Sequence, residues 1–214
     1  MLLLLAVVTI LPLYQSATVV DRIAVVVGKH AIKTSDIERD LRVTQFLNNE
    51  GPDATSIPPR KASAQRLIDQ ELIREDIAAA VNTSASVEDA EMLYRQILRA
   101  RFGGSEPLLL AELKRRGLTK QQLIEQLQWQ LTVLRFIDER FRPGVVISDE
   151  DINEYWEQHS AELRRKDLKL TSLEAATPEI RETLEGEQIN RDFEAWLAQA
   201  RKNTRIEVKI EDLK

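Results

Sequence analysis

The residues of this chain that most often carry chemistry are its two histidines. His30 lies in a predicted turn, and His159 lies far away in the sequence, near the end of a predicted helix, where a cation suits the helix dipole. Because the chain has no cysteine, thiol catalysis and thiolate metal sites are excluded, and two distant histidines make a poor zinc site. We therefore predict no metal centre, and no nucleophile has a plausible base near it.

Three consecutive carboxylates, Asp149 to Asp151, are the other candidates for chemistry, since paired acids serve hydrolases. They follow Ser148, however, and acidic side chains after a helix N-cap usually complement the positive end of the helix dipole. The formal net charge of −5 disfavours nucleic acid as a partner, and no glycine-rich phosphate loop is present. The sequence therefore predicts no cofactor, no small-molecule substrate and no nucleic-acid partner.

The residues best suited to binding are apolar. The triplet Leu108–Leu110 lies in a short predicted helix after Gly103-Gly104, and Phe102 precedes the glycines. Three consecutive leucines cannot all face one core, so at least one is expected to point outward or to contact a partner. In the alternative interpretation the triplet wedges between two neighbouring helices. The candidate peptide-binding residues are Phe102, Leu108, Leu109, Leu110 and Trp129.

The first segment, Met1–Ala17, contains no charged side chain. Its apolar stretch Leu2–Leu11 has the length of a signal-peptide hydrophobic region and is too short to span a bilayer. Ser16 and Ala17 are small residues that would permit cleavage. We expect residues 1–17 to be a signal peptide that exports the protein to the periplasm or the medium. An uncleaved leader would anchor it to the membrane instead.

The elements that must position these residues are mostly helical. The β-branched run Val19–Val27, the turn Gly28–His30 and the short strand Ala31–Lys33 predict a hairpin. At the other end, Arg205–Ile210 alternates apolar and charged residues, which is typical of a half-buried strand. Capping signals and apolar spacing predict helices over Ser35–Asn48, Arg60–Val81, Ser86–Phe102, Glu106–Arg116, Thr119–Phe141, 148–160 and 177–203.

Prolines and one wide apolar stripe refine these boundaries. The prolines of Glu50–Arg60 predict an exposed loop, and Thr177-Pro178 predicts the cap and first turn of the last helix. The stripe on Thr119–Phe141, which includes Leu127 and Leu134, is wide enough to contact helices on two sides.

The hairpin and the terminal strand are expected to need each other. A two-stranded hairpin is marginal alone, and a lone strand leaves its backbone groups unpaired. We therefore predict that Arg205–Ile210 pairs with Val19–Val27. The predicted fold class is mainly α, with a small β-sheet made by the N-terminal hairpin and the C-terminal strand. Residues 18–147 would form the hairpin and helical core, and residues 148–214 a helical extension that packs back on it.

Several segments together resemble the SurA-like periplasmic chaperones. DRIAVVVGKHAIKTSDIERDLR is similar to their opening hairpin and helix. RLIDQELIREDIAAA and VEDAEMLYRQI are similar to their next helical pair. GLTKQQLIEQLQWQLTVLRFIDERF resembles the long helix of their amino-terminal domain, and VISDEDINEYWEQ its capped continuation. These segments cover nearly the whole mature chain and contain no catalytic signature.

The resemblance implies a helical chaperone domain and a holdase function, the binding of unfolded outer-membrane or secreted polypeptides. In SurA-like proteins, parvulin prolyl isomerase domains usually sit between the capped helix and the carboxy-terminal helix. Here the corresponding stretch, 160–176, is too short for such a domain, is charged and lacks glycine. The isomerase activity is therefore not expected.

Two other functions remain open. The chain is alternatively a homologue of parvulin-type isomerases whose catalytic part is degenerate or lies on a separate chain. A third interpretation is a helical structural module that forms a homodimer by swapping its terminal elements and binds one fixed partner. Acceleration of prolyl cis–trans exchange would identify the second function, and a single stoichiometric partner would identify the third.

Overall fold

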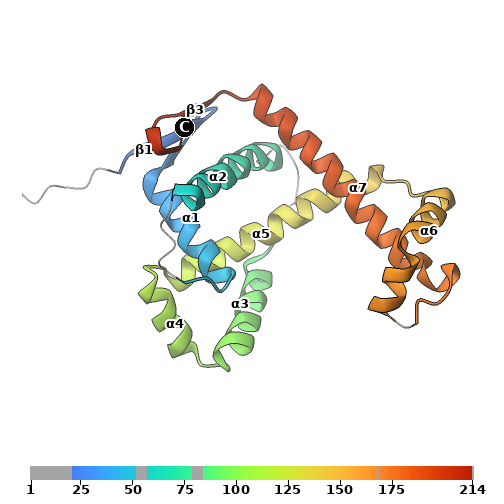
Figure 1. Ribbon diagram of the computed structural model, residues 1–214. Helices are drawn as coiled ribbons and strands as arrows, with labels where there is room; N and C mark the ends of the chain where they lie inside the picture. The colour runs from blue at the N-terminus through green and yellow to red at the C-terminus, as the bar shows by residue number, and fades with distance from the viewer. Residues whose placement is uncertain (1–20, 52–56, 79–83, 168, 214) are drawn as a thin grey trace, which may run out of the picture.

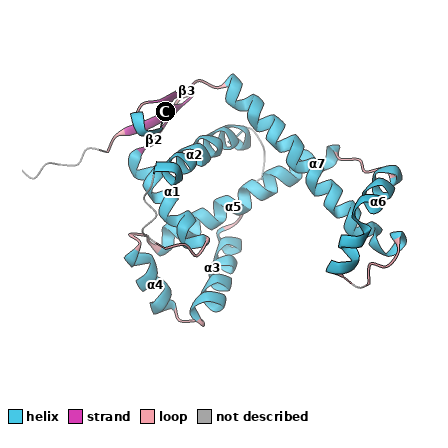
Figure 2. Cartoon of the chain, in the orientation of Figure 1, coloured by secondary structure: helices cyan, strands magenta, loops and turns pink. Residues whose placement is uncertain are grey.

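The computed structural model describes residues 21–51, 57–78, 84–167 and 169–213. The predicted signal peptide, residues 1–17, lies outside these residues. The described part is mainly helical with one small sheet, as predicted (Figures 1 and 2). In chain order the elements are β1 (Ile23–Val27), β2 (His30–Lys33), α1 (Thr34–Leu47), α2 (Ile57–Ala78), α3 (Val87–Phe102), α4 (Glu106–Arg115), α5 (Lys120–Phe141), η1 (Arg142–Gly144), α6 (Asp149–Lys166), α7 (Leu173–Asn203), β3 (Ile206–Val208) and η2 (Glu211–Leu213).

The sheet joins the two ends of the described chain. Its strand order is β2-β1-β3, and β1 is antiparallel to both neighbours. Val25 of β1 is paired with Val208 of β3, and the Lys209 amide donates a 2.8 Å hydrogen bond to the Ala24 carbonyl. The predicted pairing of the C-terminal strand with the hairpin is therefore confirmed. It satisfies backbone groups on both strands that would otherwise be unpaired.

The first core cluster lies between the sheet, α2 and the C-terminal part of α7. Its buried members are Ala24, Val25, Val27, Ile32, Ile37, Ala64, Ile68, Leu72, Leu197 and Leu213. Two ion pairs tie the end of the chain to α2: Arg201 donates two hydrogen bonds to Asp69, at 2.8 and 2.6 Å, and Arg60 donates one to Asp212 at 2.6 Å. Residues from both ends of the described chain thus share one core.

The second core cluster lies between α1, α3, α4 and α5. Its buried members are Val43, Phe46, Ala90, Tyr94, Leu109, Leu113, Leu118, Leu123, Ile124 and Leu127. The predicted caps are confirmed here, since the Ser86 side chain accepts from the Asp89 amide and the Thr119 side chain from the Gln122 amide. These caps fix where α3 and α5 begin and so align their apolar faces.

The third core cluster forms a separate lobe from α6 and the N-terminal part of α7 (Figure 1). Its buried members are Ile152, Leu163, Leu170, Ala176 and Ile180. Because α7 has 31 residues, it extends for about 46 Å at 1.5 Å per residue. One continuous helix therefore belongs to this lobe at its start and to the first core cluster at its end.

Aromatic rings join α5 to α7 where the two helices cross. Phe136 and Phe141 of α5 contact Trp196 of α7, with ring centroids 5.4 and 6.2 Å apart, respectively. Arg140 lies over the Trp196 ring at 5.5 Å and pairs with Asp76 of α2 at 2.9 Å. The wide apolar stripe of α5 therefore does contact helices on two sides, α3 at one end and α7 at the other. Leu134, predicted on that stripe, is an exception and is 62% exposed.

Two helix starts differ from the sequence predictions. The N-cap of α1 is Lys33, not Ser35. The Asp36 carboxylate accepts the Lys33 amide at 2.9 Å, while the Ser35 hydroxyl donates to Asp21, so the helix begins one residue early. Helix α2 includes Pro58 and Pro59 in its first turn, where backbone N–H groups have no intrahelical acceptor and proline is tolerated.

The predicted start of the last helix was also wrong. Ser172 caps α7 by accepting from the Ala175 amide at 3.3 Å, so Thr177-Pro178 lies inside the helix and not at its first turn. The Thr177 hydroxyl donates to the Leu173 carbonyl, which satisfies a backbone group close to the proline. The described residues between Phe141 and Arg191 therefore form η1, α6 and part of α7, linked by short turns. Across the described part of the chain, no helix is long and apolar enough to span a membrane.

Candidate functional site

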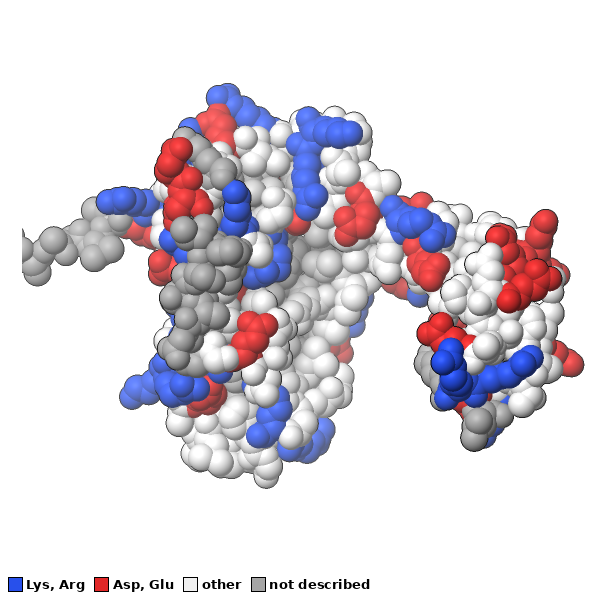
Figure 3. Space-filling view, in the orientation of Figure 1, with Lys and Arg blue, Asp and Glu red and all other residues white. Residues whose placement is uncertain are grey.

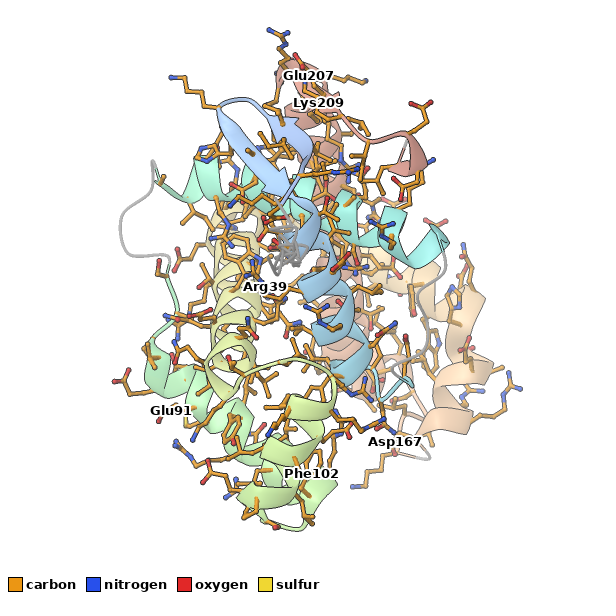
Figure 4. All side chains as sticks on the ribbon, turned by 90° about the vertical axis from the view of Figure 1, so that its left-hand side faces the viewer. Arg39, Glu91, Phe102, Asp167, Glu207 and Lys209 are labelled. Atoms are coloured by element: carbon orange, nitrogen blue, oxygen red, sulfur yellow. The ribbon has the colours of Figure 1, made fainter. Side chains whose placement is uncertain are left out.

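The hairpin formed by α3 and α4 projects at the end of the molecule opposite the sheet. In Figure 4, Phe102 lies at the lower end, and Glu207 and Lys209 of the β3 region lie at the upper end. Gly103 ends α3 with φ at 58°, a left-handed conformation that favours glycine. α4 begins at Glu106, two residues beyond Gly104. The turn therefore sets Phe102 beside the start of α4.

The leucine triplet is divided between the core and the surface. Leu109 is completely buried in the second core cluster, whereas Leu108 is 61% and Leu110 41% exposed. Successive helical residues are about 100° apart, so two neighbours of an inward residue turn outward on either side. The outward-facing expectation thus holds for Leu108 and Leu110, and the wedge interpretation describes Leu109.

Pro107 and Ala111 are also exposed and extend this surface along α4. We call Pro107, Leu108, Leu110 and Ala111, together with half-buried Phe102, the tip patch. Figure 3 shows the lower end of the molecule as a largely uncharged surface with both Lys or Arg and Asp or Glu side chains above it. Exposed apolar groups gathered in one place are typical of a contact surface for another polypeptide.

A pocket of about 410 Å³ opens beside Phe102. Arg101 borders it and lies over the Phe46 ring at 4.6 Å, and Phe46 stacks on Phe102 with ring centroids 6.4 Å apart. Glu112, which also borders the pocket, is one helical turn after Leu108 on the same side of α4. The pocket and the tip patch therefore adjoin. The pocket is lined by Leu47, Asn49, Arg101, Phe102 and Glu112.

The polar groups of this pocket carry an excess of positive charge. Glu112 accepts two 2.8 Å hydrogen bonds from Arg115 and one of 2.6 Å from Arg116, and these lower its pKa to about 2. Burial, and then the nearby charge of Arg116, lower the pKa of Arg101. Arg101 donates to two neutral acceptors, the Phe46 carbonyl at 2.7 Å and Asn49 Oδ1 at 3.0 Å. The Glu112 carboxylate is thus the one acidic group among the guanidinium groups of Arg101, Arg115 and Arg116.

Trp129 lies in a different place from the other candidate residues. It borders a groove of about 300 Å³ between β2, α1, α2 and α5, with the Arg74 guanidinium 4.2 Å from its ring centroid. The groove is largely polar, since Asp36, Arg39 and Glu71 also line it. The structure therefore brings Phe102, Leu108 and Leu110 together and places Trp129 apart from them.

Sequence reasoning missed Leu47 and Arg101 as parts of the site. The Arg101 side chain reaches the Phe46 carbonyl across 55 residues, and such a contact has no local signal. The run Pro107–Ala111, by contrast, was detectable because it contains three consecutive leucines.

The groups that first suggested chemistry each lie close to a polar neighbour. Asp151 accepts the Ser148 amide at 2.8 Å and also its hydroxyl, and these bonds lower the Asp151 pKa. His30 lies 3.8 Å from Glu71, and His159 3.9 Å from Glu162. Within the described ranges, no three His, Cys, Asp or Glu side chains are grouped as metal ligands.

Comparison with curated proteins shows a distant likeness. No protein-family model matches the chain. Over 173 residues the chain is 25% identical to Chaperone SurA of Chromobacterium violaceum. The aligned region makes up 80% of this chain, and the chain spans 40% of that relative's length. The chain is therefore distantly similar to part of a SurA chaperone, and the similarity indicates a SurA-like chaperone domain.

Proposed function

We propose that this protein is a periplasmic holdase chaperone that binds unfolded outer-membrane or secreted polypeptides and has no isomerase activity. The observation that carries the proposal is the tip patch, where Leu108 and Leu110 are exposed while their neighbour Leu109 holds the helix in the core. Removing apolar surface of this kind from water contributes about 25 cal/mol per Å², part of which offsets the loss of freedom on association. The distant similarity to a SurA chaperone supports the same function.

The tip patch suits clients without a fixed shape. It lies on a projecting hairpin, so an extended polypeptide has access from several sides, and the pocket beside Phe102 offers room for one large side chain. The groove at Trp129 is proposed as a second, weaker contact, because Arg74 already covers part of the indole ring. Export by residues 1–17 and the division into 18–147 and 148–214 remain predictions.

The proposal is tested by light scattering from a client that aggregates. An outer-membrane barrel is unfolded in urea and diluted into buffer with and without an equimolar amount of the protein. We expect suppression of scattering for this client and for two unrelated unfolded proteins. Undiminished scattering for all three would contradict the holdase proposal. Suppression for one client alone would favour the module with a fixed partner.

A protease-coupled peptide assay tests the absence of isomerase activity. The peptide contains one prolyl bond whose trans form is cleaved, so the slow phase reports cis–trans exchange. We expect the slow phase to have the same rate with and without the protein. Acceleration that grows with protein concentration would establish the isomerase alternative.

A further inference from the structure

The surroundings of the tip patch are basic in a chain that is acidic overall. The formal charge of the whole chain is −5. The segment from Arg95 to Lys120, which contains the second half of α3 and all of α4, has the opposite balance, and its two acidic residues are Glu106 and Glu112. The first half of α3 adds Glu88, Asp89 and Glu91, of which Glu91 pairs with Arg95. The basic residues of the segment are Arg95, Arg99, Arg101, Lys114, Arg115, Arg116 and Lys120.

Both acidic residues of this segment are already occupied. Glu106 accepts from Lys120 at 2.7 Å and from the Tyr94 hydroxyl at 3.2 Å. Glu112 is held by Arg115 and Arg116. Arg116 is 7% exposed, and its Nη1 has no hydrogen-bond partner among the described atoms. Donors therefore outnumber acceptors around the pocket.

Two exposed basic residues lie one helical turn from members of the tip patch, Arg99 from Phe102 and Lys114 from Leu110. Among the described residues, neither takes part in an ion pair. Arg99 and Lys114 lie in the last turns of α3 and α4, where a positive charge interacts favourably with the helix dipole. The dipole therefore explains why each of these positions holds a cation. The dipoles do not account for two cations without an ion-pair partner among the described residues beside an apolar surface.

We propose that the tip patch binds segments of unfolded polypeptide in which apolar residues are flanked by Asp or Glu, and that it discriminates against segments flanked by Lys or Arg. The apolar residues cover Leu108, Leu110 and Phe102, and the flanking carboxylates approach Arg99, Lys114 and Arg101. Complementary charge at the rim of an interface sets the choice of partner and the rate of encounter. The inference rests on the proposed holdase function and specifies its client class.

The test uses two fluorescein-labelled peptides with one shared core of Leu, Phe and Val residues. One peptide has two Glu residues on each side of the core, and the other has two Lys residues there. Fluorescence anisotropy gives the dissociation constant of each peptide for the full chain at low and high salt. We expect the Glu peptide to bind about 10-fold more tightly at low salt, and the difference to shrink as salt screens the charges.

Charge reversal assigns the preference to the tip. In Arg99→Glu/Lys114→Glu, both at exposed positions, the preference for the Glu peptide should disappear or invert. The neutral pair Arg99→Gln/Lys114→Gln should give an intermediate result, and it keeps the test valid if the first variant folds poorly. Lys29→Glu/Lys202→Glu changes the net charge equally at the sheet end and should leave the preference intact.

The outcomes separate the two proposals. Equal affinity of both peptides, or a preference for the Lys peptide, would overturn this inference and leave the holdase proposal standing. A preference that survives charge reversal at Arg99 and Lys114 would also overturn it. Failure of both peptides to bind would count against the holdase proposal itself, and the inference would fall with it.

Discussion

The sheet end and the tip end of the molecule differ in how far their apolar residues are buried, although Ile23 of β1 is itself 49% exposed. At the sheet end, β1 and β3 bring the two ends of the described chain together, and Val25 and Val27 are completely buried. At the tip end, Leu108 and Leu110 remain exposed although they flank a completely buried leucine. Apolar surface stabilises the fold at the first end and is available for binding at the second. Stability and holding should therefore respond to different substitutions.

The largest effect is expected from removing the last strand. Deletion from Ile206 onward removes the pairing with β1 and takes Leu213 out of the first core cluster. We expect a loss of about 5 kcal/mol in the free energy of unfolding and a melting temperature lower by about 10–20 °C. Circular dichroism on heating measures this change. Lys209→Ala, at an exposed position, is the matched control, and an unchanged melting temperature after the deletion would refute the role of the pairing.

Leu109→Asp should have the next largest effect. The substitution places a carboxylate in a completely buried position, at an expected cost of about 4 kcal/mol. Leu108→Asp, one residue away and exposed, should change stability by less than about 0.5 kcal/mol. Urea unfolding of the two variants compares them directly. Equal destabilisation would show that the tip belongs to the core as much as the sheet end does.

A smaller, pH-dependent effect is expected at Glu112. Its pKa of about 2 in the folded state lies below the ordinary glutamate value of 4.5, so the ionised form stabilises the fold. That contribution is fully present above pH 4.5 and is lost as the pH falls toward 2. Allowing for its partial exposure, we expect Glu112→Gln to cost about 1–2 kcal/mol at neutral pH.

The measurement for Glu112 is urea unfolding of the wild type and Glu112→Gln at pH 7 and pH 3. The difference in unfolding free energy should be clearly smaller at pH 3. A difference that is the same at both values would mean that the ion pairs with Arg115 and Arg116 do not stabilise the hairpin.

Much of the fold was predictable because its signals are local. Ser86, Thr119 and Ser148 are N-caps whose spacing to the acceptor or donor three residues later is visible in the sequence. The pairing of β3 with β1 followed from the backbone needs of an isolated strand. The start of α7 was missed because Thr177-Pro178 is also a good cap signal, and the choice of Ser172 depends on packing in the lobe.

The candidate site was predictable only in part. The triplet Leu108–Leu110 indicated a mixed environment, but its register, with Leu109 inward, depends on how α4 packs against α3 and the rest of the second core cluster. Arg101 and Leu47 join the site through contacts between distant segments, which composition and periodicity do not reveal. Trp129 was grouped with the tip by residue type alone, and the structure places it in another groove.

The most direct test is whether the variant Leu108→Asp/Leu110→Asp still holds clients. Holding is measured by light scattering as an outer-membrane barrel is diluted from urea. Val146→Asp is the matched control, because Val146 is 86% exposed and lies in the link to α6, away from the tip. We predict that the tip variant keeps the melting temperature of the wild type and loses most of its suppression of scattering, while the control retains both. Full suppression by the tip variant, or an equal loss in the control, would contradict the assignment of holding to the tip patch.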